Sequence, residues 1–160
     1  EVETALKAIQ KVKPEVACLA ELTPKEFNEV KYVLSGVVSK RAEHVVMECK
    51  RVQDAVEALK AGDLVELGRL LNESHYSLRD LYEVTGRELD TLSALARKET
   101  GCLGSRMIGA GFGGCTISIV KKSAVEGFIR RVGKAYFDAI GYRASFYETS
   151  IEDGITVQKL

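Results

Sequence analysis

The 160-residue chain has no tryptophan, only two prolines and two histidines, and no excess of charge, because 23 lysines and arginines balance 23 acids. A balanced charge argues against nucleic acid or an anionic membrane as a partner. No apolar run approaches the ~20 residues that cross a bilayer, and no secretory signal peptide is visible. These absences favour a cytoplasmic protein with neither a nucleic-acid nor a membrane partner.

Cysteine is sparse and scattered. The four are Cys18, Cys49, Cys102 and Cys115. They form no C-x-x-C pair, and neither His44 nor His75 lies near one, which argues against a zinc site or a disulfide framework. We therefore expect reduced thiols in a cytosolic protein. For Cys115, which follows a glycine-rich segment, we expect a small buried thiol, with a reactive thiol as the alternative.

The size of the chain fits one domain over residues 1–160, or one large piece of a domain pair. Its 46% apolar and 29% charged residues are ordinary for a globular protein. A helical pattern begins at once, and Glu1 stands where an initiator methionine would. We therefore expect a part of a longer protein.

The first hundred residues show the apolar periodicity of helices. Predicted helices cover Val2–Lys11, Thr23 to about Leu34, Val37–Ala61, Asp63 to about Leu81, and Thr85 to near Gly101. Capping pairs open three of them: Thr23 with Glu26, Asp63 with Glu66, and Thr85 with Glu88.

The long predicted helix carries apolar residues at alternating spacings of four and three. This seam is Val38, Ala42, Val45, Cys49, Val52, Val56 and Leu59. The spacing also suits a coiled-coil scaffold. Because only about three heptads are present, we expect packing within a helical bundle, and keep the scaffold as an alternative.

The remaining residues change to a strand pattern. Predicted strands are Leu103–Ile108, Thr116–Val120, Ala144–Ile151 and Ile155–Lys159, with a turn at Asp153-Gly154. Between the second and third strands, Ser123 and Glu126 form a capping box for a helix that Gly141 ends. The order predicts an α+β fold, with a small, mainly antiparallel sheet packed against helices.

Glycine is concentrated in one place, where four of the six residues from Gly109 to Gly114 are glycine. Bare amides in such a loop can cradle an anion, although a tight connection between two strands is an equal alternative. The dinucleotide fingerprint requires a helix after the glycines, and here a β-branched run follows. Gly109 and Gly114 also fit the outer glycines of a P-loop, but Cys115 stands before Thr116 where that motif needs a lysine for the phosphates.

The sequence shows no pattern of a catalytic nucleophile with an adjacent general base. His44 is expected to be a partly exposed structural histidine, and His75 a structural one rather than part of a cleft. Asp80 and Glu83 are candidate acids, although we expect them to be ordinary surface carboxylates. Arg106 could bind a phosphate or form a salt bridge that holds the loop. Three aromatic residues are expected to pack rather than stack on a ligand: Tyr76, Tyr82 and Phe112.

Several segments together resemble the galactokinases, a family of the GHMP kinase superfamily. They are Arg41–Val46, Asn72–Asp80, Tyr82–Thr85, Glu88–Asp90, Gly104–Cys115, and Phe146-Tyr147 with Asp153-Gly154. The glycine segment is similar to the superfamily's third motif, and the Asn-Glu-Ser-His segment narrows the resemblance to galactokinases. The resemblance runs through nearly all of the chain.

This resemblance implies a GHMP kinase C-terminal domain, which is a ferredoxin-like elaboration, with an N-terminal lobe missing from these 160 residues. The family enzyme has two lobes and transfers the γ-phosphate of ATP to the C1 hydroxyl of α-D-galactose, with magnesium. Its catalytic aspartate, sugar contacts and main phosphate loop belong to the N-terminal lobe. The resemblance thus implies no catalytic residue or metal ligand in this chain.

The resemblance to the third motif implies that eight residues line or support the cleft that binds ATP and the sugar. Those expected to line or support it are Ser105, Arg106, Gly109, Ala110, Gly111, Phe112, Gly113 and Gly114. The isolated chain is expected to be inactive, and to dimerise through apolar surface that its own N-terminal lobe would cover.

Small departures from the family bear on fine specificity: Ile108 stands where threonine is frequent, Leu81 where a second acid is common, and Gly86-Arg87 where Cys-Pro is frequent. Two alternatives remain open. One is a GHMP kinase for another sugar, such as N-acetylgalactosamine. The other is a galactokinase-like sensor that binds sugar and ATP to regulate a partner protein.

Overall fold

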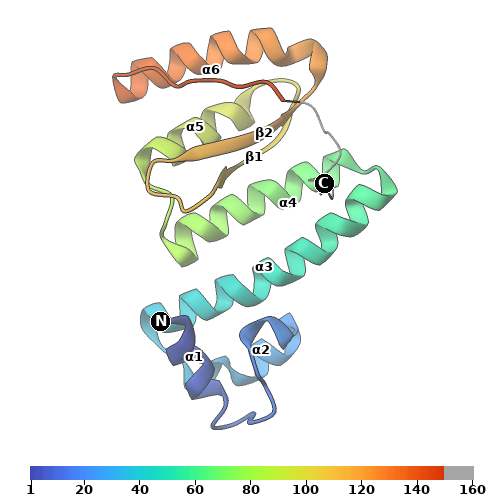
Figure 1. Cartoon of the computed structure of the whole chain (residues 1–160), viewed down its shortest axis with the longest axis vertical. Coiled ribbons are helices and arrows are strands. Elements are labelled where there is room, and N and C mark those ends of the chain that lie inside the picture. The colour runs from blue at the N-terminus through green and yellow to red at the C-terminus, as the bar shows by residue number, and fades with distance from the viewer. Residues whose placement is uncertain (150–160) are drawn as a thin grey trace, which may run out of the picture.

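A computed structural model describes residues 1–149. Its helices and strands are α1 (Val2–Ile9), α2 (Pro24–Val30), α3 (Gly36–Ala61), α4 (Leu64–Ser77), α5 (Arg87–Lys98), β1 (Cys102–Ile108), β2 (Cys115–Val120) and α6 (Val125–Ile140). Figure 1 shows them stacked along the long axis, from α6 through α5 and the β-hairpin to α4, α3 and the α1–α2 end. The predicted α+β class is confirmed.

Two predicted helix starts are confirmed by their caps. Thr23 Oγ1 accepts the Glu26 amide at 3.2 Å while the Glu26 carboxylate accepts the Thr23 amide at 2.9 Å. Asp63 Oδ1 accepts the Glu66 amide at 2.9 Å. Each bond satisfies an amide that the first turn of a helix leaves without a partner.

Two other predicted caps are wrong. Helix α5 begins at Arg87 after Gly86, whose φ of 82° turns the chain so that Thr85 makes no capping bond and is buried instead. Before α6, residues Lys122–Ala124 form a 3₁₀ turn, so Ala124 rather than Ser123 is the N-cap. The predicted helix from Asp63 is also interrupted, because α4 gives way to a π-helical turn at Leu78–Tyr82.

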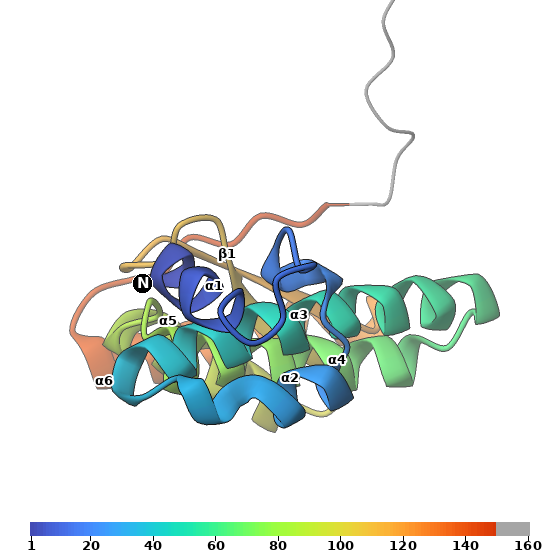
Figure 2. The ribbon, with the colours of Figure 1, turned by 90° about the horizontal axis from the view of Figure 1, so that it is seen from below.

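The apolar seam of α3 packs along only part of its length. Ala42 of the seam is buried in a core shared with Ile9 of α1 and Phe27 of α2, and Val38 and Val45 pack against that core. Further along, the exposed fractions are 57% for Val52, 42% for Val56 and 54% for Leu59. The prediction that the whole seam packs within a bundle is wrong for this second half. Seen from below in Figure 2, the α3–α4 end projects past α1 and α2.

The hairpin β1–β2 is antiparallel, with Ser105 opposite Ser118 and Ile108 opposite Cys115. Cys102 and Val120 of the hairpin pack against a cluster of Ala96, Phe128 and Val132 from α5 and α6. Met107 of β1 is buried in another cluster, with Leu78 and Leu89.

The predicted strand Ala144–Ile151 is not found, since residues 144–149 form neither helix nor strand. The last two residues of that strand, the turn at Asp153-Gly154 and the strand Ile155–Lys159 lie outside the described residues. Within residues 1–149, no helix is both long and apolar enough to cross a bilayer.

Candidate functional site

The outer edge of β1 is closed by side chains of helix α4. Asn72 Oδ1 accepts the Ser105 amide at 2.9 Å, and His75 Nδ1 accepts the Met107 amide at 3.1 Å. Residues three apart share one face of a helix, and alternate amides of a strand point to the same side. Asn72 and His75 therefore take the place of a neighbouring strand, which gives the Asn-Glu-Ser-His segment a structural role.

Helix α4 reaches this edge because two glycines meet where the helix crosses the strand. A Cβ added to Gly68 would lie 2.2 Å from the Leu103 carbonyl oxygen, and one added to Gly104 would lie 2.3 Å from the Gly68 oxygen. Real Cβ atoms do not tolerate such distances to main-chain atoms. Only glycine at both positions lets the backbones approach closely enough for the two side-chain bonds.

His75 is fully buried and held in one tautomer. Its Nδ1 accepts the Met107 amide, so the ring proton lies on Nε2, 3.2 Å from Asp90 Oδ1. Burial lowers the pKa of His75, and the positive charge of Arg97 acts in the same direction, against the opposing effect of Asp90. The histidine is neutral and structural, as expected.

Ser105 supports the site from inside the fold. Its Oγ accepts the Ser118 hydroxyl at 2.9 Å, and its carbonyl accepts Ser93 Oγ at 2.8 Å and Arg97 Nη1 at 3.1 Å. The residue has no exposed surface. It ties both strands to α5 and presents nothing to solvent.

Arg106 makes a salt bridge to α3 rather than to the glycine loop. Its Nη1 lies 3.1 Å from Glu48 Oε1, which also accepts the Ser74 hydroxyl at 2.5 Å. The other Glu48 oxygen accepts Arg51 Nε at 2.9 Å. Burial acts to raise the pKa of Glu48, but the bonds from Ser74 and Arg51 and the charges of Arg51 and Arg106 outweigh it, so this pKa lies below its usual range.

The glycine loop between the strands is fixed against the residues before α5. The Phe112 amide donates to the Val84 carbonyl at 2.8 Å. A Cβ on Gly111, whose φ is 86°, would lie 2.0 Å from that same oxygen. Gly111 is therefore required both by its backbone conformation and by the close approach of Val84.

This loop offers main-chain donors. The amides of Gly109, Ala110, Gly111 and Gly113 have no hydrogen-bond partner among residues 1–149. Phe112, at φ 55°, is 78% exposed, so the expectation that it packs is wrong. Successive amides in a turn of this kind make a concave surface suited to anions.

Other predicted candidates lie apart from the loop. His44 is buried, against expectation; its Nδ1 is 2.9 Å from Ser77 Oγ, and its ring packs on the Tyr82 ring with centroids 4.5 Å apart and a tilt of 31°. Burial lowers the pKa of His44. Asp80 pairs with Arg79 at 2.7 Å, as a surface carboxylate is expected to do.

Glu83 likewise pairs with Arg41 at 2.8 Å and with Lys40 at 3.2 Å. The prediction of a buried thiol at Cys115 is wrong, because this residue, the first of β2, is exposed. No group of three or more His, Cys, Asp or Glu able to hold a metal ion occurs in the part of the chain that the structure describes. Sequence reasoning missed Glu48, which precedes the seam residue Cys49 and has no local pattern that marks its role.

Comparison with known proteins places these features in a family. A family model described as GHMP kinases C terminal matches residues 55–139. The galactokinase of Clostridium beijerinckii is 54% identical over 155 residues, which are 96% of this chain and 40% of that protein. The galactokinase of Lactobacillus helveticus is 52% identical over 151 residues, 94% of this chain and 39% of that protein.

Among solved structures, Lactococcus lactis galactokinase complexed with galactose superimposes with a TM-score of 0.85 and 43% identity. The match covers 91% of this chain and 38% of that one. The chain thus spans about 40% of the length of the curated relatives it matches. Because the family model covers more than half of its residues, the chain belongs to the GHMP kinase C-terminal family.

Proposed function

We propose that this chain is the C-terminal part of a galactokinase. The whole protein would transfer the γ-phosphate of ATP to the C1 hydroxyl of α-D-galactose, giving galactose 1-phosphate and ADP. The observation that carries the proposal is an identity of 54% to a galactokinase along almost the whole chain. Both substrates are small molecules of the cell interior, so we place the enzyme in the cytoplasm.

The proposed contribution of this chain is one wall of the ATP and sugar cleft. Phosphoryl transfer depends chiefly on positioning and on electrostatic stabilisation of the phosphate oxygens. The four amides without partners, at Gly109, Ala110, Gly111 and Gly113, are donors already fixed in place, so they need little reorganisation to meet an oxyanion. Phe112 would lie at the rim of the cleft.

The remaining third-motif residues would act as supports for that wall. Ser105 and Arg106 anchor β1 to α5 and α3, while Gly109 and Gly114 flank the loop. The described residues do not fit a magnesium site, since no cluster of acids converges near the loop. A magnesium ion used by the whole enzyme would be held by residues outside this chain and by the nucleotide's phosphates.

The loop also lacks a proton acceptor for the sugar hydroxyl. The only side chains from Gly109 to Gly114 are those of Ala110 and Phe112, neither of which accepts a proton. The nearest candidate acids, Asp80 and Glu83, are engaged by Arg79 and Arg41. We therefore propose that the 160-residue chain has no kinase activity by itself. We also propose that, alone, it dimerises through apolar surface that the N-terminal lobe would cover.

The test measures galactose-dependent release of ADP by the whole polypeptide and by the 160-residue chain in parallel. Turnover by the first and none by the second is the expected result. Turnover with N-acetylgalactosamine in place of galactose would contradict the sugar assignment. Galactose binding without turnover by a folded whole protein would contradict the enzyme assignment and favour a sensor.

A further inference from the structure

The connection between α4 and α5 contains a glutamate in a conformation that is usual for glycine. Glu83 follows the π-helical turn Leu78–Tyr82 with φ 60° and ψ 44°, in the left-handed region. Its amide and that of Val84 both donate to the Leu78 carbonyl, the second at 3.2 Å. This pattern closes a helix whose left-handed residue is most often glycine. A side chain there is strained, and such strain persists where surrounding contacts hold it.

Arg41 of α3 makes the contacts that hold this turn. Its Nη1 donates to the Leu81 carbonyl at 2.5 Å, and its Nη2 donates to the Glu83 carboxylate at 2.8 Å. The guanidinium therefore binds the turn on both sides of Tyr82, whose ring centroid lies 5.9 Å from it. Only 11% of the Arg41 side chain is exposed, so solvent screens these bonds little.

Lys40, the preceding residue of α3, bonds to the same carboxylate without holding the main chain. Its Nζ lies 3.2 Å from Glu83 Oε1, and half of its side chain is exposed. That carboxylate is the one hydrogen-bond partner of its ammonium group within residues 1–149. Exposed ion pairs of this kind contribute little. Arg41, which reaches both a carboxylate and a main-chain carbonyl, is therefore the residue that fixes the turn.

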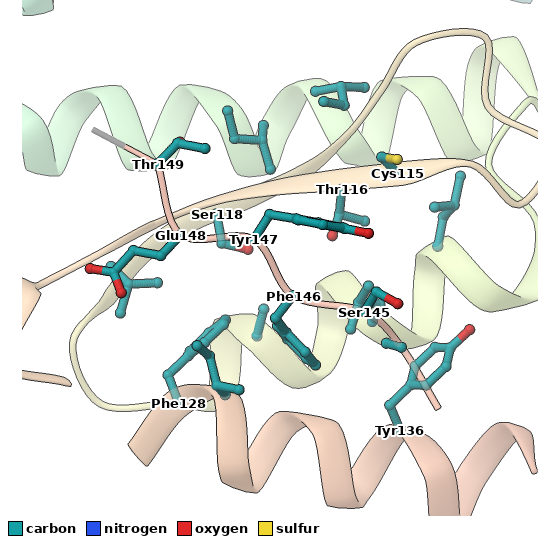
Figure 3. A pocket seen from close by; sticks show the side chains of 18 of the residues that line it. Cys115, Thr116, Ser118, Phe128, Tyr136, Ser145, Phe146, Tyr147, Glu148 and Thr149 are labelled. Atoms are coloured by element: carbon teal, nitrogen blue, oxygen red, sulfur yellow. The ribbon is translucent and has the colours of Figure 1, made fainter. Parts of the chain in front are cut away.

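The turn determines where the glycine loop lies. The Val84 carbonyl accepts the Phe112 amide at 2.8 Å, and a Cβ on Gly111 would lie 2.0 Å from the same oxygen. Within residues 1–149, this is the one main-chain hydrogen bond that joins Gly109–Gly114 to another element. The far end of the loop, from Gly113 to Cys115, borders a cavity of about 900 Å³ (Figure 3). The position of the loop therefore depends on the Val84 carbonyl.

We propose that Arg41 is a positioning residue for the glycine loop, acting through Leu81 and Glu83 on the Val84 carbonyl. The proposal rests on the proposed function in one respect, which is that the loop amides bind nucleotide phosphate. A planar guanidinium suits this role because its donors have fixed directions and can hold two acceptors at once. A loop that is fixed before ATP binds also lowers the cost of ordering it on binding.

Amide hydrogen exchange in the 160-residue chain tests this path without a catalytic assay. In Arg41→Gln, we expect the Val84 and Phe112 amides to exchange about tenfold faster, because the turn loses charge-assisted hydrogen bonds. The Met107 amide, which α4 holds, lies outside the path and should not change. The matched control Lys40→Gln removes a charge from the same carboxylate and should leave all three amides within about twofold of their original rates.

The substitution Glu83→Gly distinguishes positioning from a general loss of stability. Glycine adopts a positive φ without a Cβ penalty, so adding Glu83→Gly to Arg41→Gln should return Phe112 exchange to within about threefold of the original rate. If Arg41 acted through stability alone, the second substitution would speed exchange further, because it also removes the ion pair with Lys40. That result would overturn the proposal, as would equal Phe112 exchange in Arg41→Gln and Lys40→Gln.

Kinetics of the whole polypeptide give the readout at the site itself. We expect Arg41→Gln to raise the KM for ATP about tenfold, whereas Lys40→Gln should leave it unchanged. A merely structural role would reduce the amount of folded enzyme without changing this KM. Faster Phe112 exchange with an unchanged KM for ATP would contradict phosphate binding by the loop, while positioning by Arg41 would stand. Unchanged Phe112 exchange in Arg41→Gln would overturn the positioning role, whatever the kinetics.

Discussion

The two edges of the β-hairpin differ in how their main-chain groups are satisfied. On β1, Asn72 and His75 of a helix accept two alternate amides. On β2, the corresponding groups of Thr116 and Ser118 meet no described residue. The difference shows that a helix can close the edge of a sheet. Here two acceptors three residues apart on one face of the helix meet two amides that are two residues apart on the strand.

Breaking the glycine contact should have the largest effect on the closed edge. In Gly68→Val the new side chain would collide with the Leu103 carbonyl, which lies 2.2 Å from a Cβ there. We expect a loss of about 3 kcal/mol in the free energy of unfolding, measured by urea denaturation.

The matched control for this change is Gly127→Ala in α6. There a Cβ meets only the flexible end of Arg131, and alanine is favoured inside a helix. We expect that variant to keep or slightly raise stability. Equal losses in Gly68→Val and Gly127→Ala would show that close approach of α4 to β1 does not matter.

Removing an acceptor from the closed edge should have the next largest effect. His75→Leu fills similar space but leaves the buried Met107 amide without a partner, which costs about 2 kcal/mol. His75→Gln, which retains an acceptor, is expected to recover part of that loss. Urea midpoints of the two variants would settle the comparison, and identical midpoints would argue against the hydrogen bond.

Acidification should weaken the same edge. Burial lowers the pKa of His75 in the folded state, so below the unfolded-state pKa near 6.5 the unfolded chain binds more protons. Stability is therefore complete above about pH 6.5 and falls as the pH drops toward the folded-state pKa. Urea midpoints from pH 7.5 to 5 should decline, and His75→Gln should reduce the slope. A residual slope is expected from His44, whose pKa is also lowered by burial.

The open edge should give the smallest effect. Thr116→Ala in the 160-residue chain removes no hydrogen bond that the described residues show, so we expect a change below about 0.5 kcal/mol. A loss comparable to that of His75→Leu would mean that this edge is already paired within the chain.

Sequence reasoning succeeded where structure is local. The caps at Thr23 and Asp63 depend only on residues three positions away, and both form as predicted. Thr85 and Ser123 carry the same pattern and fail, because Gly86 with a positive φ and a 3₁₀ turn redirect the chain. The roles of Asn72 and Glu48 depend on strands and helices far away in sequence, and no local pattern contains them.

The glycine loop was predicted from its composition, but its requirements were not. Nothing in the sequence indicates that Val84 contacts Gly111. The strand predicted at Ala144 has the correct alternation, yet a strand needs a partner, and none of residues 1–149 supplies it. The alternation of a strand is present at residues 144–147, while no pairing partner is found among residues 1–149.

The most direct measurement is amide hydrogen exchange on the 160-residue chain, resolved at four positions. We predict slow exchange for Ser105 and Met107, whose amides Asn72 and His75 accept. We predict fast exchange for Thr116 and Ser118, on the open edge of β2. Protection of all four amides to the same degree in the monomeric chain would contradict the contrast between a closed and an open edge.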